Sequence, residues 1–219
     1  MEPPIVGAAI SGQFIGFSEI DSEAKSRFGN YLHLASSFLA NSDNDWMSGE
    51  AELFQGDSWQ FFCPDPTKAL PAAIAIRGFL RNRSKLDCKV SLGFGSVDHL
   101  DVAKVSLSHG KAFSLSRLGM KDLVRKRTFS IRMSEKTSVA QSNADAVAYL
   151  LDVLMTLWTP TQAYSVALMM TGASRTELAS QLNPPISKQA FGKRLFGARW
   201  KEVDLAIKSF SSTLPTLYV

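Results

Sequence analysis

Every strand-like segment of this chain lies within its first 133 residues, and this uneven distribution restricts the fold more than any other feature. Runs rich in β-branched, aromatic and small apolar residues predict strands at residues 5–17, 50–55, 58–63, 89–94 and 128–133. Apolar residues at helical spacing predict helices at residues 22–40, 66–82 and 108–123. The order is β-α-β-β-α-β with a further helix and strand, which predicts a ferredoxin-like α+β domain with an extension.

The chain changes character after a polar stretch at residues 134–143, which we interpret as a linker. An apolar helix is expected at residues 144–158, and the segments that follow it also have helical patterns. A chain of 219 residues has room for one or two domains. We therefore predict an α+β domain over residues 1–135 and an all-α domain over residues 140–219.

The all-α segment has the layout of a helix-turn-helix. A helix at residues 161–170 ends near Gly172, which is suited to a helix C-terminus. Ser174 and Glu177 have the spacing of a capping box at the start of a short second helix. Asn183-Pro184-Pro185 then breaks the chain, and Ser187 can cap a third helix from residue 188 to about residue 200.

The third helix begins with polar and basic residues, as a helix that enters the major groove of DNA must. Gln189 can pair with adenine, and Lys and Arg side chains can pair with guanine or with phosphate. Basic charge is also concentrated here, because residues 158–214 hold seven Lys and Arg against three Asp and Glu. The expected apolar stripe of the helix is Ala190, Phe191, Leu195 and Phe196. The candidate DNA-binding residues are Ser187, Lys188, Gln189, Lys193, Arg194 and Arg199.

The sequence "TELASQLNPPISKQAFGKRL" at residues 176–195 resembles the helix-turn-helix of MarR-like and other winged regulators and of sigma-factor-like modules. The pair Pro184-Pro185 departs from that pattern by lengthening the turn. The resemblance implies a DNA-binding protein, and a transcriptional regulator in particular. A helical bundle with a solvated basic face and a protein-interaction module are the alternatives.

Four segments of the first 130 residues resemble the SatD family, a branch of the nucleotide-cyclase fold. They are "AAISGQFIGFSEI" (8–20), "FQGDSWQFFCPDPTKAL" (54–70), "VSLGFGSV" (90–97) and "SHGKAFSLSR" (108–117). In cyclases of this fold, the first strand and the central hairpin each supply an acidic residue that binds Mg²⁺. The resemblance places Asp57 at the hairpin position and Gln13 where the other Asp is expected.

A neutral amide is a poor ligand for a hard dication, so we expect this metal site to be degenerate and the domain to be inactive. Such a domain would serve as a sensor or dimerisation unit, with a small-molecule or nucleotide ligand and no bound cofactor. The alternative is an active nucleotidyl cyclase or a related metal-dependent nucleotide enzyme.

The remaining features favour a soluble, cytoplasmic protein. The apolar run near the N-terminus has no basic segment before it, and residues 149–158 are too few to span a membrane. Cys63 and Cys88 lie in apolar runs, which predicts buried free thiols. The helix at 144–158 carries a wide apolar surface, formed by Val147, Leu150, Leu151, Leu154 and Leu157. We expect this surface to contribute to a homodimer, and the alternative is burial against the rest of the same chain.

Overall fold

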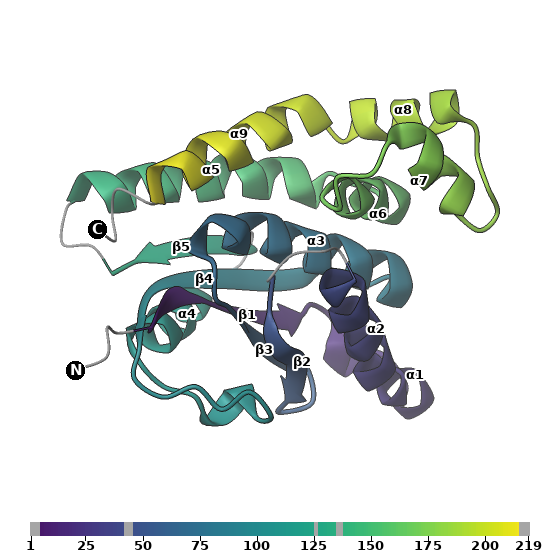
Figure 1. Cartoon of the computed structure of the whole chain (residues 1–219). Helices are drawn as coiled ribbons and strands as arrows, with labels where there is room; N and C mark the ends of the chain where they lie inside the picture. Colours follow the sequence, from purple (N-terminus) through teal and green to yellow (C-terminus); the bar gives the residue numbers. More distant parts are fainter. Residues whose placement is uncertain (1–4, 42–45, 125–126, 135–137, 215–219) are drawn as a thin grey trace.

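The computed structural model describes residues 5–41, 46–124, 127–134 and 138–214. In this part of the chain, five strands form one sheet in the order β2-β3-β1-β4-β5 (Figure 1). The central strand β1 (Ile5–Phe14) runs antiparallel to both of its neighbours, β3 (Ser58–Cys63) and β4 (Cys88–Val97). β2 (Ser48–Phe54) is one edge, antiparallel to β3, and β5 (Phe129–Met133) is the other, parallel to β4. A fold of helices around one five-stranded sheet is confirmed, and so is the predicted order of elements in the first 133 residues.

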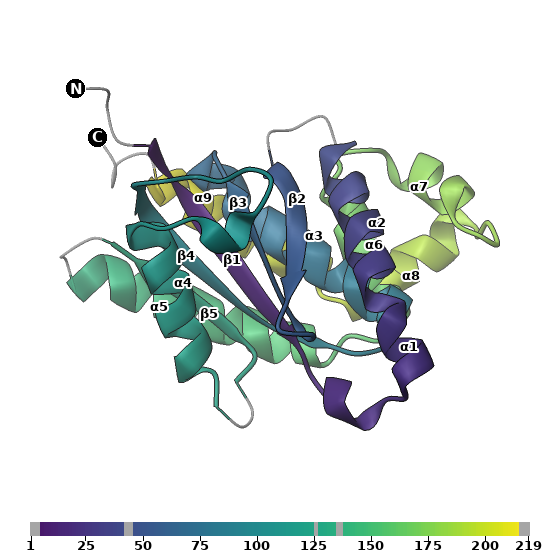
Figure 2. The same ribbon diagram turned by 90° about the horizontal axis from the view of Figure 1, so that it is seen from below.

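Helices connect these strands over both faces of the sheet. The chain passes from β1 through α1 (Ser22–Ser26) and α2 (Phe28–Ala40) to the β2–β3 hairpin. α3 (Pro66–Ser84) follows on the same face, whereas α4 (Lys111–Asp122) covers the opposite face between β4 and β5 (Figure 2). Asp65 caps α3 by accepting a hydrogen bond from the Thr67 amide at 2.9 Å, as the Asp-Pro pair predicts.

Two predicted elements end where the backbone changes direction. β1 ends at Phe14 rather than at residue 17, because Gly16 adopts a left-handed conformation (φ 77°) that leads into a 3₁₀ turn. The helix predicted at residues 22–40 is interrupted at Arg27, which separates α1 from α2.

Alternate residues of β1 face two different environments. Ile10 and Phe14 point into the main hydrophobic core under α2 and α3, whereas Ser11 and Gln13 point to the face that α4 partly covers. Gly12 shares the core-facing side with Ile10, and a Cβ there would lie 2.1 Å from the ring of Trp59. Only glycine at this position lets the fully buried indole cross β1.

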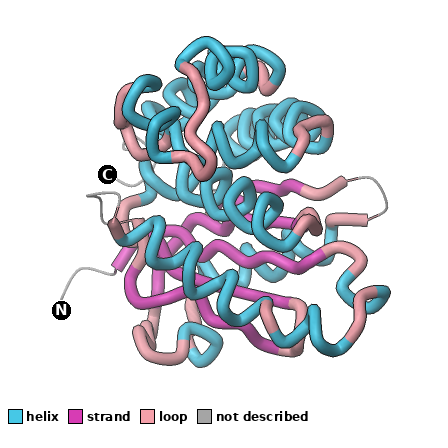
Figure 3. Tube along the Cα trace, turned by 90° about the vertical axis from the view of Figure 1, so that its right-hand side faces the viewer, coloured by secondary structure: helices cyan, strands magenta, loops and turns pink. Residues whose placement is uncertain are grey.

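The C-terminal helices stack on α3 and on the edge of the sheet (Figures 1 and 3). They are α5 (Ser138–Thr156), α6 (Pro160–Met169), α7 (Arg175–Gln181), α8 (Lys188–Gly197) and α9 (Trp200–Thr213). α6 crosses α3 closely, because a Cβ at Gly78 would lie 2.4 Å from the carbonyl oxygen of Ala163. Phe210 of α9 packs edge-on against Phe94 of β4, with 5.8 Å between ring centroids. One continuous hydrophobic cluster therefore includes buried residues from both predicted domains.

A buried polar network also joins α3 to α5. Arg77 donates to both carboxylate oxygens of Asp87 at 2.9 Å and to Thr128 Oγ1 at 2.8 Å. Thr128 in turn donates its amide and its hydroxyl to Asp152 of α5, and Arg81 donates to the Met155 carbonyl at 2.8 Å. The two segments are thus linked by directional bonds as well as by apolar contact.

Two boundaries in the C-terminal segment differ from the prediction. α5 begins at Ser138, so the end of the stretch interpreted as a linker is helical; residues 135–137 lie outside the described part. The third helix of the predicted helix-turn-helix ends at Gly197, because Arg199 adopts a left-handed conformation (φ 56°), and α9 starts at Trp200.

Candidate functional site

The α7–α8 segment is held by caps at the start of each helix. Ser174 accepts from the Glu177 amide at 3.3 Å, and Ser187 accepts from the Ala190 amide at 3.1 Å. The Glu177 side chain does not complete the predicted capping box; it accepts from Gln181 at 3.4 Å instead. A complete capping box starts α6, between Thr159 and Gln162, and the Thr-Pro-Thr-Gln sequence could have predicted it.

The loop between α7 and α8 is anchored to the helix before it. The Ile186 amide donates to the carbonyl of Ala179 at 3.1 Å, while Leu178 and Ala179 are buried against the other helices. On α8, Phe191 and Leu195 fill the same core. The turn lengthened by Pro184-Pro185 therefore still brings α8 back against α7 and α6.

The exposed side of α8 carries Gln189 and Lys193, with Lys188 exposed at its start. Gly192 lies on the same side, and a Cβ there would meet nothing within 4 Å. Phe196 was predicted in the apolar stripe, but its side chain is 78% exposed, and this prediction is wrong. The buried side of α8 is formed at 3- and 4-residue spacing by Phe191, Leu195 and Ala198. Phe196 lies one residue after Leu195, so its side chain is rotated by about 100° around the helix and faces solvent.

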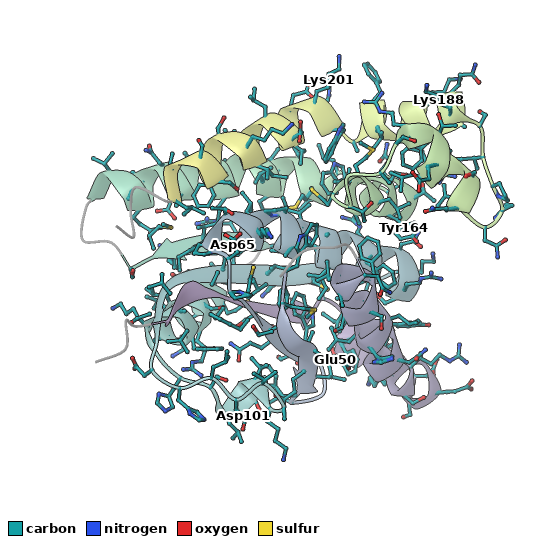
Figure 4. All side chains as sticks on the ribbon, in the orientation of Figure 1. Glu50, Asp65, Asp101, Tyr164, Lys188 and Lys201 are labelled. Carbon is teal, nitrogen blue, oxygen red and sulfur yellow. The ribbon has the colours of Figure 1, made fainter. Side chains whose placement is uncertain are left out.

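Arg194 lies apart from the other candidate DNA-binding side chains. It is half-buried and lines a hollow of about 330 Å³ together with Arg83, Tyr164 and Asn183. That flank of α8 faces α3 and α6, and Tyr164 belongs to α6 (Figure 4). The structure thus places Gln189 and Lys193 on one exposed side of α8, with Lys188 exposed at the start of the helix, and separates Arg194 from them.

Several cations of this region make no ion pair with any residue that the structure describes. Arg175, Lys188, Lys193, Arg194 and Lys201 belong to this set, whereas Lys208 pairs with Asp204 at 2.7 Å and Arg199 approaches Glu202 at 4.0 Å. Lys188 and Lys201 both lie on the side of the C-terminal helices that faces away from the sheet (Figure 4). The outer surface therefore carries cations, Lys188 and Lys201 among them, whose charge no ion pair among the described residues balances.

Arg175 and Lys201 were not among the predicted site residues. They come together with Arg199 around a hollow of about 350 Å³ beside α8. Arg175 is 24 positions before Arg199 in the sequence, and no local pattern predicts that the start of α7 approaches the corner between α8 and α9. Only the folding of the three helices brings these charges together.

The second candidate site is at the end of β1. Gln13 lies opposite Ser58 of β3 and Lys89 of β4, and its side-chain amide donates to Asp57 Oδ2 at 3.0 Å. The other oxygen, Oδ1, accepts from the Ser58 hydroxyl at 3.0 Å. Gln13 and Asp57 are therefore neighbours in space, and the hydrogen bond directs the amide of Gln13 at the carboxylate. The degenerate metal or nucleotide site expected from these two residues stays a prediction.

This arrangement does not suit the divalent metal that the cyclase resemblance implies. One carboxylate is present where two would be needed, and the NH₂ group of Gln13 stands against it. Lys89 lines the same hollow and adds a positive charge beside Asp57. Among the described residues, no three His, Cys, Asp or Glu side chains gather where they could hold a metal ion.

A larger polar hollow of about 510 Å³ lies beside Gln13, between the sheet and α4. Gln60 donates to the Ser11 hydroxyl at 2.8 Å on its floor, and Arg117 and Lys121 of α4 line its rim. Cys63 and Cys88 are buried free thiols, as predicted, and burial raises the pKa of both. They lie on the opposite, apolar side of the sheet and contribute no reactive group to this hollow.

Comparison with known proteins adds little to this geometry. No family model matches the chain, and no curated protein matches it. Among solved structures, the crystal structure of the guanylyl cyclase Cya2 aligns with a TM-score of 0.42 and 11% identity, over 57% of this chain and 74% of that one. A likeness of this size supports no argument about activity, and the resemblances to the SatD family and to MarR-like regulators stay predictions. In the described residues, each helix is too short or too polar to cross a bilayer.

Proposed function

We propose that this chain binds double-stranded DNA through α8 and the cations around it, and that it acts as a transcriptional regulator. The observation that carries the proposal is the exposed side of α8. Gln189 and Lys193 project from it beside Gly192, while Phe191 and Leu195 fix the opposite side in the core. A helix whose exposed side carries Gln189, Lys193 and an open glycine is suited to the major groove, which is about 12 Å wide.

The start of α8 is suited to a phosphate of the DNA backbone. The first amides of a helix have no partner inside the helix, and Ser187 satisfies one of them at Ala190. Lys188 is the first residue of the helix and is exposed there. Its ammonium and the remaining amides would meet an anion together.

The pattern of ion pairs favours DNA over an inert solvated face. A solvent-exposed helix surface with no binding role is stabilised by pairs of opposite charges three or four residues apart, such as Lys208 with Asp204 on α9. Lys188, Lys193 and Lys201 have no such partner among the described residues, so their charge is free to neutralise phosphates.

We further propose that the protein pairs as a homodimer through α5, since one helix-turn-helix contacts few base pairs. Of the surface predicted for this role, Leu151 is buried and Val147 and Leu154 are half-buried, whereas Leu150 and Leu157 are 65% and 76% exposed. Val153 lies between them, giving the 3- and 4-residue spacing of a helix that packs against another helix.

For the N-terminal domain we propose a non-catalytic role as a sensor. The strand order β2-β3-β1-β4 supports the proposal of a ferredoxin-like domain, to which β5 is added. The polar hollow lined by Gln13, Gln60 and Arg117 would hold a small-molecule or nucleotide ligand. The nucleotidyl cyclase alternative requires a second metal ligand at the place where Gln13 contacts Asp57.

The DNA proposal is tested by fluorescence anisotropy with a labelled 30-base-pair duplex of mixed sequence, titrated at several salt concentrations. The wild type should bind with a non-specific Kd in the range of about 1–100 µM, with an affinity that falls steeply as salt rises. The variant Lys188→Ala/Lys193→Ala should bind more weakly, and its salt slope should be smaller by about two.

The matched control is Lys104→Ala/Lys111→Ala, which removes the same charge from exposed residues on the α4 side of the sheet. It should leave both the affinity and the salt slope close to wild type. Equal losses in the two double variants would show that only net charge matters, and the assignment to α8 would then fail.

A further inference from the structure

Phe196 is the most exposed large apolar side chain on α8, at 78%, and it lies on the same side of the helix as Gln189 and Lys193. A phenyl ring left in water does not gain the favourable free energy of burial. Single exposed apolar residues are common on protein surfaces, so the exposure alone decides nothing. What surrounds the ring distinguishes it from an ordinary exposed residue.

The ring borders the hollow of about 350 Å³ between α7, α8 and α9. Two aromatic side chains line it, Phe196 and the half-buried Trp200. Three cations also line it: Arg175 from the start of α7, and Arg199 and Lys201 from the start of α9. Glu202 is the one acidic residue of the lining and lies 4.0 Å from Arg199. The hollow therefore combines flat apolar surfaces with a net positive charge.

The backbone at the rim of the hollow is strained. Arg199 has φ 56° and no side-chain cap bond to α9, a conformation that glycine would adopt at lower cost. Its guanidinium carbon lies 5.9 Å from the centroid of the Phe196 ring. The residue with the strained backbone, Arg199, therefore also carries the positive charge next to the exposed ring of Phe196.

We propose that this hollow binds an unpaired nucleobase together with its phosphate, so that the protein prefers DNA with unpaired bases over a perfect duplex. This inference rests on the proposed binding of DNA by α8. Aromatic side chains stack on the flat face of a base, and Arg and Lys neutralise the phosphate attached to it. A stacked, paired base cannot offer its face, so only a looped-out or terminal base can enter.

The position and size of the hollow agree with this ligand. Gly192 and Phe196 belong both to the lining of the hollow and to the exposed side of α8, so a strand that follows α8 passes its opening. At about 350 Å³ the hollow is at the small end of ligand pockets. It suits one nucleotide rather than a longer segment.

The test compares three labelled DNA probes of equal length and phosphate number in the full-length protein. One is a perfect duplex, the second carries two unpaired thymines, and the third has abasic sites in place of those thymines. For the wild type, the unpaired probe should bind about five-fold or more tighter than the duplex, since stacking is worth about 1–3 kcal/mol per base. The abasic probe should bind like the duplex.

Variants of Phe196 distinguish the effect of its aromatic ring from the effect of its size. Phe196→Leu should lose the preference, measured as the ratio of the affinity for the unpaired probe to the affinity for the duplex, and Phe196→Tyr should keep it. Leu205→Ala is the control, because Leu205 is an exposed apolar residue of α9 that does not line the hollow. Quenching of tryptophan fluorescence gives a second readout, since Trp200 is half-exposed whereas Trp46, Trp59 and Trp158 are buried.

Equal affinity for all three probes would overturn the inference, and so would a preference that the abasic probe retains. If the wild type binds no DNA at all, the proposed function fails together with it. If the duplex binds but unpaired bases add nothing, only the inference about the hollow fails. A wild-type dimer that Phe196→Leu converts to a monomer in light scattering would identify the ring as a self-association contact and would also overturn it.

Discussion

Replacing Asp87 with Asn tests whether the buried polar network holds the C-terminal helices on the sheet domain. Asp87 accepts from Arg77 through both oxygens and from Arg81 Nη1, each at 2.9 Å, and its Oδ1 also accepts from the Cys88 amide at 2.8 Å. Asn keeps the shape of the side chain but removes the charge and replaces one acceptor with a donor. Arg77, whose side chain is 3% exposed, would lose its closest counter-charge.

The magnitude follows from this burial. Removing one partner of a buried ion pair costs about 3–5 kcal/mol, because the remaining charge stays desolvated. Arg81 and Asp87 are 16% and 18% exposed, and Asp152 still lies 3.9 Å from Arg77, so the loss should fall near the lower end. We expect Asp87→Asn to reduce the free energy of unfolding by about 3 kcal/mol at pH 7.

The loss should depend on pH in a defined direction. Burial by itself would raise the pKa of Asp87, but the charge and hydrogen bonds of Arg77, with the charge of Arg81, lower it below its usual value. A lowered carboxyl pKa stabilises the fold above the unfolded-state pKa of about 3.9, and this stabilisation disappears as the pH falls through the folded-state value. The difference between wild type and variant should therefore be full at pH 5–7 and should shrink below about pH 4.

The measurement is urea denaturation followed by fluorescence and circular dichroism at pH 7, at pH 5 and at the lowest pH where the wild type is still folded. Asp204→Asn is the control, because its partner Lys208 is 71% exposed and such pairs contribute less than about 1 kcal/mol. A loss below about 1 kcal/mol at pH 7, or the same loss at every pH, would refute the reasoning.

Three further predictions concern other parts of the molecule. Leu150→Glu should convert a homodimer to a monomer in light scattering at micromolar concentration, whereas Leu205→Glu on α9 should not; a monomeric wild type would contradict the α5 interface. Gln13→Asp should place a second carboxylate beside Asp57, and calorimetry should detect Mg²⁺ binding to this variant but not to the wild type. The wild type should form no product, measured by chromatography, from any of the four nucleoside triphosphates. Phe191→Ala should lower the free energy of unfolding by about 3–5 kcal/mol, because the ring is fully buried, and a loss under 1 kcal/mol in urea denaturation would contradict its place in the core.

Local chemistry made much of the fold predictable from the sequence. Asp65-Pro66 starts α3, and Ser187 caps α8. The β2–β3 hairpin turns at Gln55-Gly56-Asp57, which includes the predicted pair Gly56-Asp57. Each of these features depends on short-range hydrogen bonds and allowed backbone angles within a few residues. The strand and helix order follows from hydrophobic periodicity, which is also a local property. The contact between Gln13 and Asp57 was expected only as an implication of the resemblance to cyclases, and it is the pairing of β1 with β3 that brings the two residues together.

The tertiary structure decided everything that depends on which side of an element meets the core. Phe196 and Leu195 are adjacent apolar residues, and nothing in the local sequence predicts that one is exposed and the other buried. The positions of α6 and α7 determine which of the two side chains faces the core. The same packing separates Arg194 from Lys193 and gathers Arg175, Arg199 and Lys201 around one hollow. Hydrophobic periodicity locates the boundary of the apolar side of a helix to within about one residue, which is a rotation of about 100° around the helix axis. The residues that form a binding surface depend on smaller rotations than that. The sequence alone therefore determined the elements and their order, and only the packing of helices remote in sequence determined the surface on which function is proposed.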